Sequence, residues 1–141
     1  MSDKLSNYSN FPIITSKLNI TENIITNLIN SFYSKVRNDK ILGPIFQDKI
    51  GDNWEEHLKT MRDFWSGIAI GTGRYKGQPL LKHINLPNLQ EEHFKRWLSL
   101  FTENAYNTCS KEVAEFFIDR AKKIANSLLQ GIEFYRGKEI L

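Results

Sequence analysis

Two histidines and two large polar aromatic residues are the side chains of this sequence that are best suited to bind a ligand or take part in a reaction. His57 lies four residues before Met61 in a stretch with helical periodicity, and His83 lies in the glycine- and proline-broken segment GTGRYKGQPLLKHINLP. Two imidazoles separated by a helix-breaking segment can lie on opposite sides of a flat ligand. Tyr33 and Trp97 add a phenol and an indole N–H as hydrogen-bond donors. This set suits a non-covalent haem pocket that handles a diatomic gas.

Each of these residues, taken alone, also has an ordinary structural interpretation. A lone histidine on a helix face is more often structural than a ligand, and Tyr33, Phe46 and Trp97 all suit plain core packing. His57 is the strongest single candidate, because its ring lies beside an apolar helix face where an unpaired imidazole is costly. His93, in the polar run EEHFKR, is predicted to be solvated. The hypothesis therefore depends on the spacing of the whole set.

The hydrophobic pattern predicts four main helices in two pairs, and an all-α class, because no segment alternates with period two. Gly43-Pro44 is predicted to end the first helix, and the residues from Gly71 to Pro79 exclude one continuous helix after the second. The fourth helix is expected to reach Ile132. The predicted start signals are Thr21, the pair Asp52 and Glu55, the pair Asn88 and Glu91, and Ser110.

The size and charge of the chain fit one globular domain. It has 141 residues, of which 40% are hydrophobic, and this length suits a single core. The net charge of +3 comes from lysines and arginines that are spread along the chain, so we expect no nucleic-acid partner. We expect an N-terminal extension over residues 1–20, a helical domain over 21–132 and a C-terminal tail over 133–141.

Cysteine usage and hydropathy bear on the cellular location. Cys109 is the only cysteine, which rules out an intramolecular disulfide and lends no support to an oxidising compartment. No C-x-x-C-H motif occurs, so any haem would be held without thioether links. No stretch approaches about eighteen unbroken apolar residues, and the N-terminus lacks the apolar core of a signal peptide. We therefore expect a cytoplasmic protein with no membrane partner.

Four stretches of the chain carry a family resemblance. They are FYSKVRNDKILGPIF, WEEHLKTMRDFWSG, YKGQPLLKHINLP and FKRWLSLF. Together they resemble the truncated haemoglobins, the short two-over-two globins, and specifically their third group, over the residues from Thr21 to Leu129. The glycine pairs that mark other truncated-globin groups are not evident, which fits the third group. The resemblance implies a truncated globin fold, a two-over-two helical sandwich around a non-covalent haem b.

The resemblance also implies a role for individual residues. His83 would be the proximal iron ligand, His57 would lie at the distal gate, and Phe46 would stack on the haem. The distal residues expected to stabilise a bound ligand are Tyr33, His57 and Trp97. The residues expected to contact the cofactor are Phe46, His57, Met61, His83 and Trp97.

The surroundings of His83 bear on its chemistry. One ring nitrogen would bind iron while the other donates to a backbone carbonyl and so fixes the tautomer. Lys82 and Ile84 flank it, so no neighbouring carboxylate makes it a peroxidase-like ligand. The basic residues that could pair with the haem propionates are Lys59, Arg62, Arg74, Lys76 and Lys82.

Three functions remain open at this point. The first is a haem protein that binds O2, CO and NO in a polar distal pocket, for O2 retention or redox chemistry. The second is a haem enzyme, a nitric oxide dioxygenase or a peroxidase-like protein, which needs an external reductase; peroxide and cyanide are further candidate ligands. The third is a helical interaction module without a cofactor, which would be colourless when purified. His57, His83 and one cysteine lack the ligand spacing of a zinc site.

Overall fold

A computed structural model describes residues 18–84, 86 and 89–140, and every regular element within these ranges is a helix. In chain order the helices are α2 (Glu22–Asn38), α3 (Leu42–Ile50), α4 (Trp54–Ala69), α5 (Pro79–Ile84), α6 (Glu91–Thr108) and α7 (Lys111–Ile140). Residues 1–17 of the expected N-terminal extension lie outside the described residues. The predicted all-α class is confirmed.

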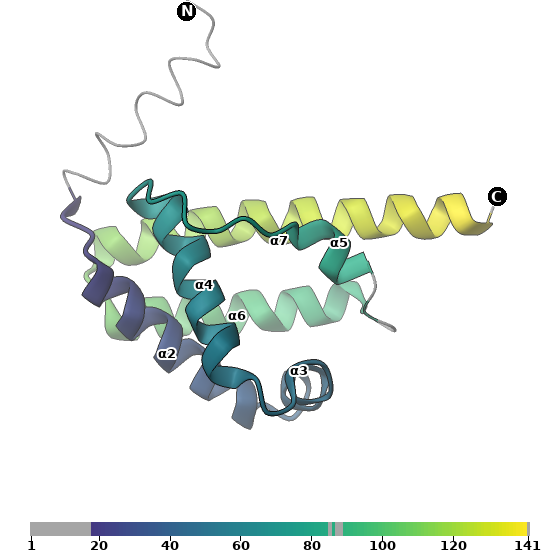
Figure 1. The fold of residues 1–141 in the computed structure, drawn as a ribbon, viewed down its shortest axis with the longest axis horizontal. Helices are drawn as coiled ribbons and strands as arrows, with labels where there is room; N and C mark the ends of the chain where they lie inside the picture. The colour runs from purple at the N-terminus through teal and green to yellow at the C-terminus, as the bar shows by residue number, and fades with distance from the viewer. Residues whose placement is uncertain (1–17, 85, 87–88, 141) are drawn as a thin grey trace, which may run out of the picture.

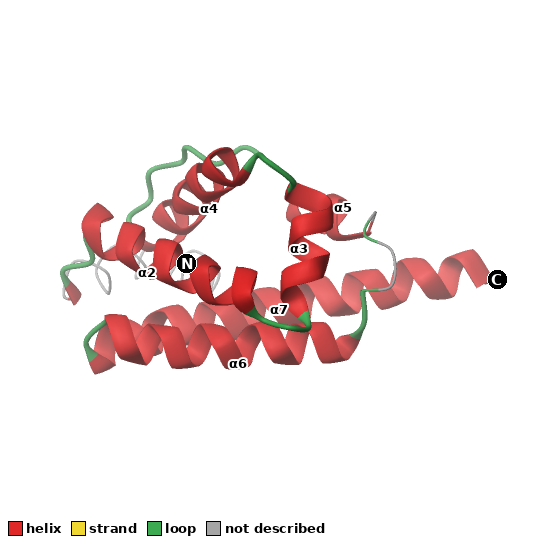
Figure 2. Cartoon of the chain, turned by 90° about the horizontal axis from the view of Figure 1, so that it is seen from below, coloured by secondary structure: helices red, strands yellow, loops and turns green. Residues whose placement is uncertain are grey.

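The helices form two layers. Figure 1 shows α6 and α7 running side by side, with α2 and α4 crossing them. Figure 2 shows α2, α4 and α5 on the same side of the α6–α7 pair. Within the described ranges, no helix is long and apolar enough to cross a membrane. The arrangement is a two-over-two sandwich, with α2 and α4 as one layer and α6 and α7 as the other.

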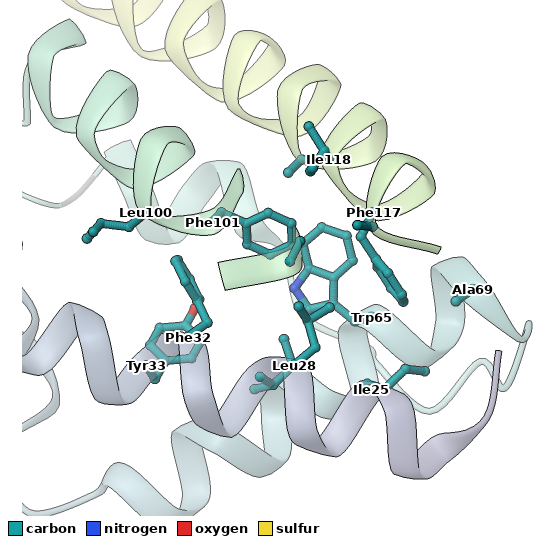
Figure 3. Close-up of a cluster of buried hydrophobic side chains, with 14 of the residues drawn as sticks. Ile25, Leu28, Phe32, Tyr33, Trp65, Ala69, Leu100, Phe101, Phe117 and Ile118 are labelled. Atoms are coloured by element: carbon teal, nitrogen blue, oxygen red, sulfur yellow. The ribbon is translucent and has the colours of Figure 1, made fainter. Parts of the chain in front are cut away.

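The core between the layers is aromatic and centres on Trp65 of α4 (Figure 3). Its indole stacks on Phe101 of α6, with ring centroids 5.2 Å apart, and meets Phe117 of α7 edge-on at 5.8 Å. All three side chains are almost completely buried. Burial of one such side chain stabilises a fold by about 1.5–3 kcal/mol, so this contact fixes α4 on α6 and α7.

The first helix begins where its sequence predicts. The Thr21 hydroxyl oxygen accepts a hydrogen bond from the backbone N–H of Ile24 at 3.3 Å, which satisfies one of the free donors of the first turn. The apolar stripe faces the core, and its buried members are Ile25, Leu28, Ile29, Phe32, Tyr33 and Val36. The predicted cap and the predicted face are both confirmed.

The prediction that Gly43-Pro44 ends the first helix is wrong. Helix α2 ends at Asn38, and both Gly43 and Pro44 lie in the first turn of α3. Proline is tolerated there because its missing N–H would have no partner within the helix. A Cβ on Gly43 would come within 2.8 Å of the Arg37 carbonyl oxygen, so glycine allows α3 to start close against the end of α2.

The starts of α4 and α6 differ from the predicted capping pairs. Helix α4 begins at Trp54, its N-cap residue is Asn53, and no side chain caps its first turn, so the predicted pair Asp52 and Glu55 does not form a cap. Asn88 lies outside the described residues, and Gln90 is the N-cap residue of α6. There the backbone N–H of Gln90 donates to Nδ1 of His93 at 2.9 Å. His93, predicted to be solvated, instead closes a capping box.

The last helix starts as predicted and runs further than expected. The Ser110 hydroxyl oxygen accepts a hydrogen bond from the backbone N–H of Val113 at 3.4 Å. Helix α7 then continues to Ile140, so residues 133–140, expected to be a tail, prolong it. Ile132 is 1% exposed and packs with Leu89 and Phe94, which places the second half of α7 against the start of α6.

Asp39 joins the corner between α2 and α3 to α6. Its carboxylate accepts hydrogen bonds from the backbone N–H groups of Ile41 and Leu42 at 3.1 and 2.9 Å. It also pairs with the Arg96 guanidinium, at 2.9 Å from Nε and 2.5 Å from Nη2. The hydrogen bond from Arg96 is the main cause that lowers the pKa of this carboxyl below its ordinary value.

We expect Asp39→Ala to lower the free energy of unfolding by about 1–3 kcal/mol at pH 7, because it removes a cap and a charged hydrogen bond. Asp39→Asn keeps an acceptor for the cap and should cost less. The folded state holds the Asp39 proton more weakly than the unfolded state. The ionised carboxylate therefore stabilises the fold above the unfolded pKa of about 3.9, and this stabilisation disappears as the pH falls through the lowered folded value.

Thermal unfolding at pH 7 and below pH ~3 checks this expectation. The gap in Tm between the wild type and Asp39→Asn should narrow in acid. A gap that is the same at both pH values would mean that the charge of Asp39 does not contribute to stability.

Candidate functional site

His57, Tyr33 and Phe46 meet in one aromatic cluster, formed by α4, α2 and α3. The rings of Tyr33 and His57 are perpendicular, with centroids 5.1 Å apart. Phe46 lies 5.9 Å from the Tyr33 ring and 6.4 Å from the His57 ring. The structure thus brings together three of the residues that the sequence predicts for the site.

Two polar groups of this cluster, the His57 imidazole and the Tyr33 hydroxyl, are uncharged at neutral pH. Burial is the main cause that lowers the pKa of His57 to about 4, and the positive charge of Lys82 adds a smaller effect, so the His57 imidazole is neutral at pH 7. Its Nε2 atom is buried without a hydrogen-bond partner among the described residues. Burial also raises the pKa of Tyr33, which keeps its hydroxyl protonated. An unpaired buried polar atom is costly, so the cluster fits a ligand that supplies a hydrogen-bonding partner.

His83 lies on the short helix α5, and its ring has a defined orientation. Nδ1 of His83 is 2.7 Å from the backbone carbonyl oxygen of Pro79. A carbonyl can only accept, so Nδ1 carries the proton and Nε2 keeps its lone pair. The expected hydrogen bond to a backbone carbonyl is therefore present. This tautomer leaves Nε2 of His83 able to act as a metal ligand.

The segment that leads to α5 is held at its start. Residues 71–78 have no regular structure, and Figure 1 shows them leading from the end of α4 to α5. Gly71 and Gly73 have φ values of +82° and +68°, which favour glycine. Arg74 then pairs with Asp63 of α4 at 2.9 Å and with Glu22 of α2 at 2.6 Å. These contacts anchor the segment that aims His83.

The five basic residues predicted as propionate partners divide into two groups. Three already have partners: Arg74 binds two carboxylates, Lys59 pairs with Asp63 at 3.1 Å, and Arg62 donates to Asn30 at 3.4 Å. Lys76 and Lys82 have no ion pair within the described ranges. The positive charge of Lys82 contributes to the lowered pKa of His57.

Trp97 and Met61 lie beside the cluster rather than in it. The Trp97 ring contacts Phe32 edge-on at 5.5 Å and stacks on Phe101 at 5.2 Å. Among the described residues it has no ring contact with Tyr33 or His57. Trp97 and Met61 are both half-buried and pack against the main core. Among the described residues, the indole N–H of Trp97 forms no hydrogen bond.

Trp54 belongs to the cluster, although the sequence did not single it out as a site residue. Its ring lies 5.7 Å from the His57 ring and 6.2 Å from the Tyr33 ring, and it stacks on Phe46 at 6.5 Å. The only signal in the sequence is its position, three residues before His57 on the same helix face. Tryptophan at such a position is usually interpreted as core packing, and this one is indeed 6% exposed.

A two-over-two helical sandwich with one histidine on α4 and another on α5 is typical of a truncated globin. The profile of the bacterial-like globins matches residues 18–129. The group 3 truncated haemoglobin ctb of Campylobacter jejuni is 40% identical over 121 residues, which are 84% of this chain and 95% of that protein. The group 2 truncated haemoglobin YjbI of Bacillus subtilis is 23% identical over 116 residues, which are 81% of this chain and 87% of that protein.

A solved structure supports the same conclusion. The crystal structure of a group III truncated haemoglobin from Campylobacter jejuni matches with a TM-score of 0.77 at 40% identity, covering 80% of this chain and 91% of that one. The chain therefore belongs to the bacterial-like globin family, as a truncated haemoglobin of the third group. Family membership implies a haem cofactor and the binding of oxygen or similar diatomic ligands.

Proposed function

We propose that this globin holds haem b without a covalent link and binds its iron through Nε2 of His83. The hydrogen bond from Nδ1 of His83 to the Pro79 carbonyl oxygen supports this role, because it leaves the other ring nitrogen free to coordinate. His57 belongs to the opposite, distal side. Phe46, Met61 and Trp97 supply half-buried apolar surface that a planar porphyrin can cover. Lys82 pairs with a propionate.

One observation carries the proposed role in O2 retention. The hydroxyl of Tyr33 and the ring Nε2 of His57 lie in a largely apolar cluster, and neither has a hydrogen-bond partner among the described residues. Trp97 adds an indole N–H that is likewise unused in this part of the chain. Donors in a dry site strengthen their bonds to a ligand that carries partial negative charge. Such a polar distal pocket favours slow release of O2.

The physiological role that follows is redox chemistry on reactive gases rather than oxygen delivery. Bound haem would supply the iron that takes up O2 and the chemistry that oxidises nitric oxide to nitrate. This reaction leaves the iron ferric, so a reductase must supply one electron for each turnover. The protein contributes donors that retain O2 and apolar side chains that exclude water. Peroxidase-like turnover is a weaker alternative, because His83 donates to a backbone carbonyl and not to a carboxylate.

Ligand kinetics and turnover test this proposal together. The oxygenated protein should release O2 slowly in stopped-flow experiments and should consume nitric oxide continuously when a chemical reductant is supplied. Nitrate should accumulate in step with the nitric oxide consumed, and peroxide turnover should be modest. Fast O2 release without sustained consumption would contradict the proposal and would leave a simple carrier or sensor.

We expect His57 to control ligand admission more than affinity. Its ring packs against the rings of Tyr33 and Trp54, and its buried Nε2 has no hydrogen bond to break within the described chain when the ring swings outward. His57→Leu should change the CO association rate by about threefold or more, while O2 release changes less than in Tyr33→Phe. Flash photolysis measures both rates. Association that is indifferent to the substitution would rule out a gate at this position.

A further inference from the structure

A cleft of about 710 Å³ opens on the outer side of the aromatic cluster, between α2, α3 and the start of α4. Tyr33, Trp54 and Leu58 form its apolar floor, and exposed polar side chains such as Ser34, Arg37 and Gln47 form its rim. The cleft is far larger than a diatomic gas needs. Neither His57 nor His83 lines it, so it is distinct from the surface where a porphyrin would lie.

A single layer of aromatic rings separates this cleft from His57. Trp54 and Tyr33 both line the cleft, and the same two rings contact the His57 imidazole at 5.7 and 5.1 Å. A gas molecule in the cleft is therefore separated from the His57 imidazole by one side chain. Whether it passes depends on how firmly these rings are held.

Trp54 is held from the solvent side by weak contacts. The Arg37 guanidinium lies 4.5 Å from the centre of its ring, and its indole N–H donates to Oε1 of Gln47 at 3.1 Å. Arg37 and Gln47 are both exposed, and interactions with exposed partners contribute little. Rotation of the indole breaks these two solvent-side contacts, which water can replace, together with its ring contacts with Phe46 and Tyr33. Tyr33, by contrast, is embedded in α2 against Phe32, with rings 4.9 Å apart.

We propose that the cleft is a second route by which diatomic ligands reach the distal site, with Trp54 as its movable wall and Arg37 and Gln47 as its outer latch. The inference rests on the proposed haem function and adds a route that does not pass through His57. Opening of the wall exposes His57 to the cleft, which Tyr33 already lines, without displacing the porphyrin.

Zinc protoporphyrin in place of haem tests the route, because O2 does not bind to the zinc ion and only its access to the porphyrin is measured. Dissolved O2 quenches the triplet state of this porphyrin on contact, so the bimolecular quenching rate constant measures access alone. Trp54→Ala should raise this rate constant about threefold or more, because it removes the wall. Ser34→Trp, at an exposed position on the rim, should lower it about twofold or more by filling the cleft.

Asn23→Trp is the matched control, since it adds the same ring at an exposed position of α2 outside the cleft and should leave the rate constant unchanged. If loss of the buried Trp54 ring prevents folding, Ser34→Trp still tests the route, because this variant leaves Trp54 in place. Quenching that responds to His57→Leu but to neither Trp54→Ala nor Ser34→Trp would overturn the route and leave the haem function intact. Slowing of equal size in Asn23→Trp would also overturn it. A protein that takes up no porphyrin would overturn the haem function, and the route with it.

Discussion

His83→Ala should lose most of its haem, with affinity reduced about tenfold to a hundredfold, as expected when a ligand or its close support is removed from a metal site. Helix α5 holds the His83 ring through a single hydrogen bond from Nδ1 to the Pro79 carbonyl oxygen. Removal of the ring should leave a space that free imidazole can fill. Haem titration followed by the Soret band, with and without added imidazole, measures both the loss and the rescue.

His93→Ala is the control for this experiment. His93 caps α6 through Nδ1 and lies in the polar first turn, so its loss should affect stability slightly and haem binding not at all. A His83→Ala protein that keeps full haem and a normal ferrous–CO spectrum would show that another residue binds the iron.

Tyr33→Phe and Trp97→Phe should each speed O2 release, and at least one of them by about tenfold or more. A hydrogen bond to a charged acceptor contributes about 1.5–3 kcal/mol, and each ~1.4 kcal/mol corresponds to about a factor of ten in rate or affinity. Tyr33→Phe removes only an oxygen and keeps the ring contacts with Phe32, Phe46 and His57. The effect should therefore appear in dissociation, measured by stopped flow, with little change in association.

The two donors can compensate for each other, so the double variant must also be measured. Tyr106→Phe is a matched control, because it removes a phenol from α6 at a residue that is half exposed and away from the aromatic cluster. If the single variants and the double variant all release O2 at the wild-type rate, Tyr33 and Trp97 only pack and the retention hypothesis fails.

The helices were predictable where local chemistry decides them. The Thr21 cap and the Ser110 cap follow from hydroxyl side chains before apolar stripes, and both form. Gly43-Pro44 misled the prediction because the pair breaks a helix interior but suits a first turn, and only tertiary contact with Arg37 shows which applies. The use of His93 as a capping side chain was not foreseen, because Gln–His is an uncommon version of the capping box.

The site was predictable for residues whose chemistry is distinctive and less so for residues that act through position. His57 and Tyr33 stand out by type, and the structure places their rings in contact. Trp54 looked like an ordinary core residue, and its contacts on both sides of one wall come from the crossing of α2, α3 and α4. The sequence suggested Arg74 as a propionate partner, but its guanidinium donates a hydrogen bond to the carboxylate of Glu22, which lies 52 positions earlier in the chain.

The two faces of helix α4 have different roles. Trp65 is clamped between α6 and α7, while His57, Met61 and Phe64 occupy the half-buried side. Because Trp65 fixes α4 through rings of α6 and α7, a substitution of His57 leaves the main anchor of the helix in place. A lineage can therefore shift from one gas chemistry to another by a few substitutions on one surface of one helix.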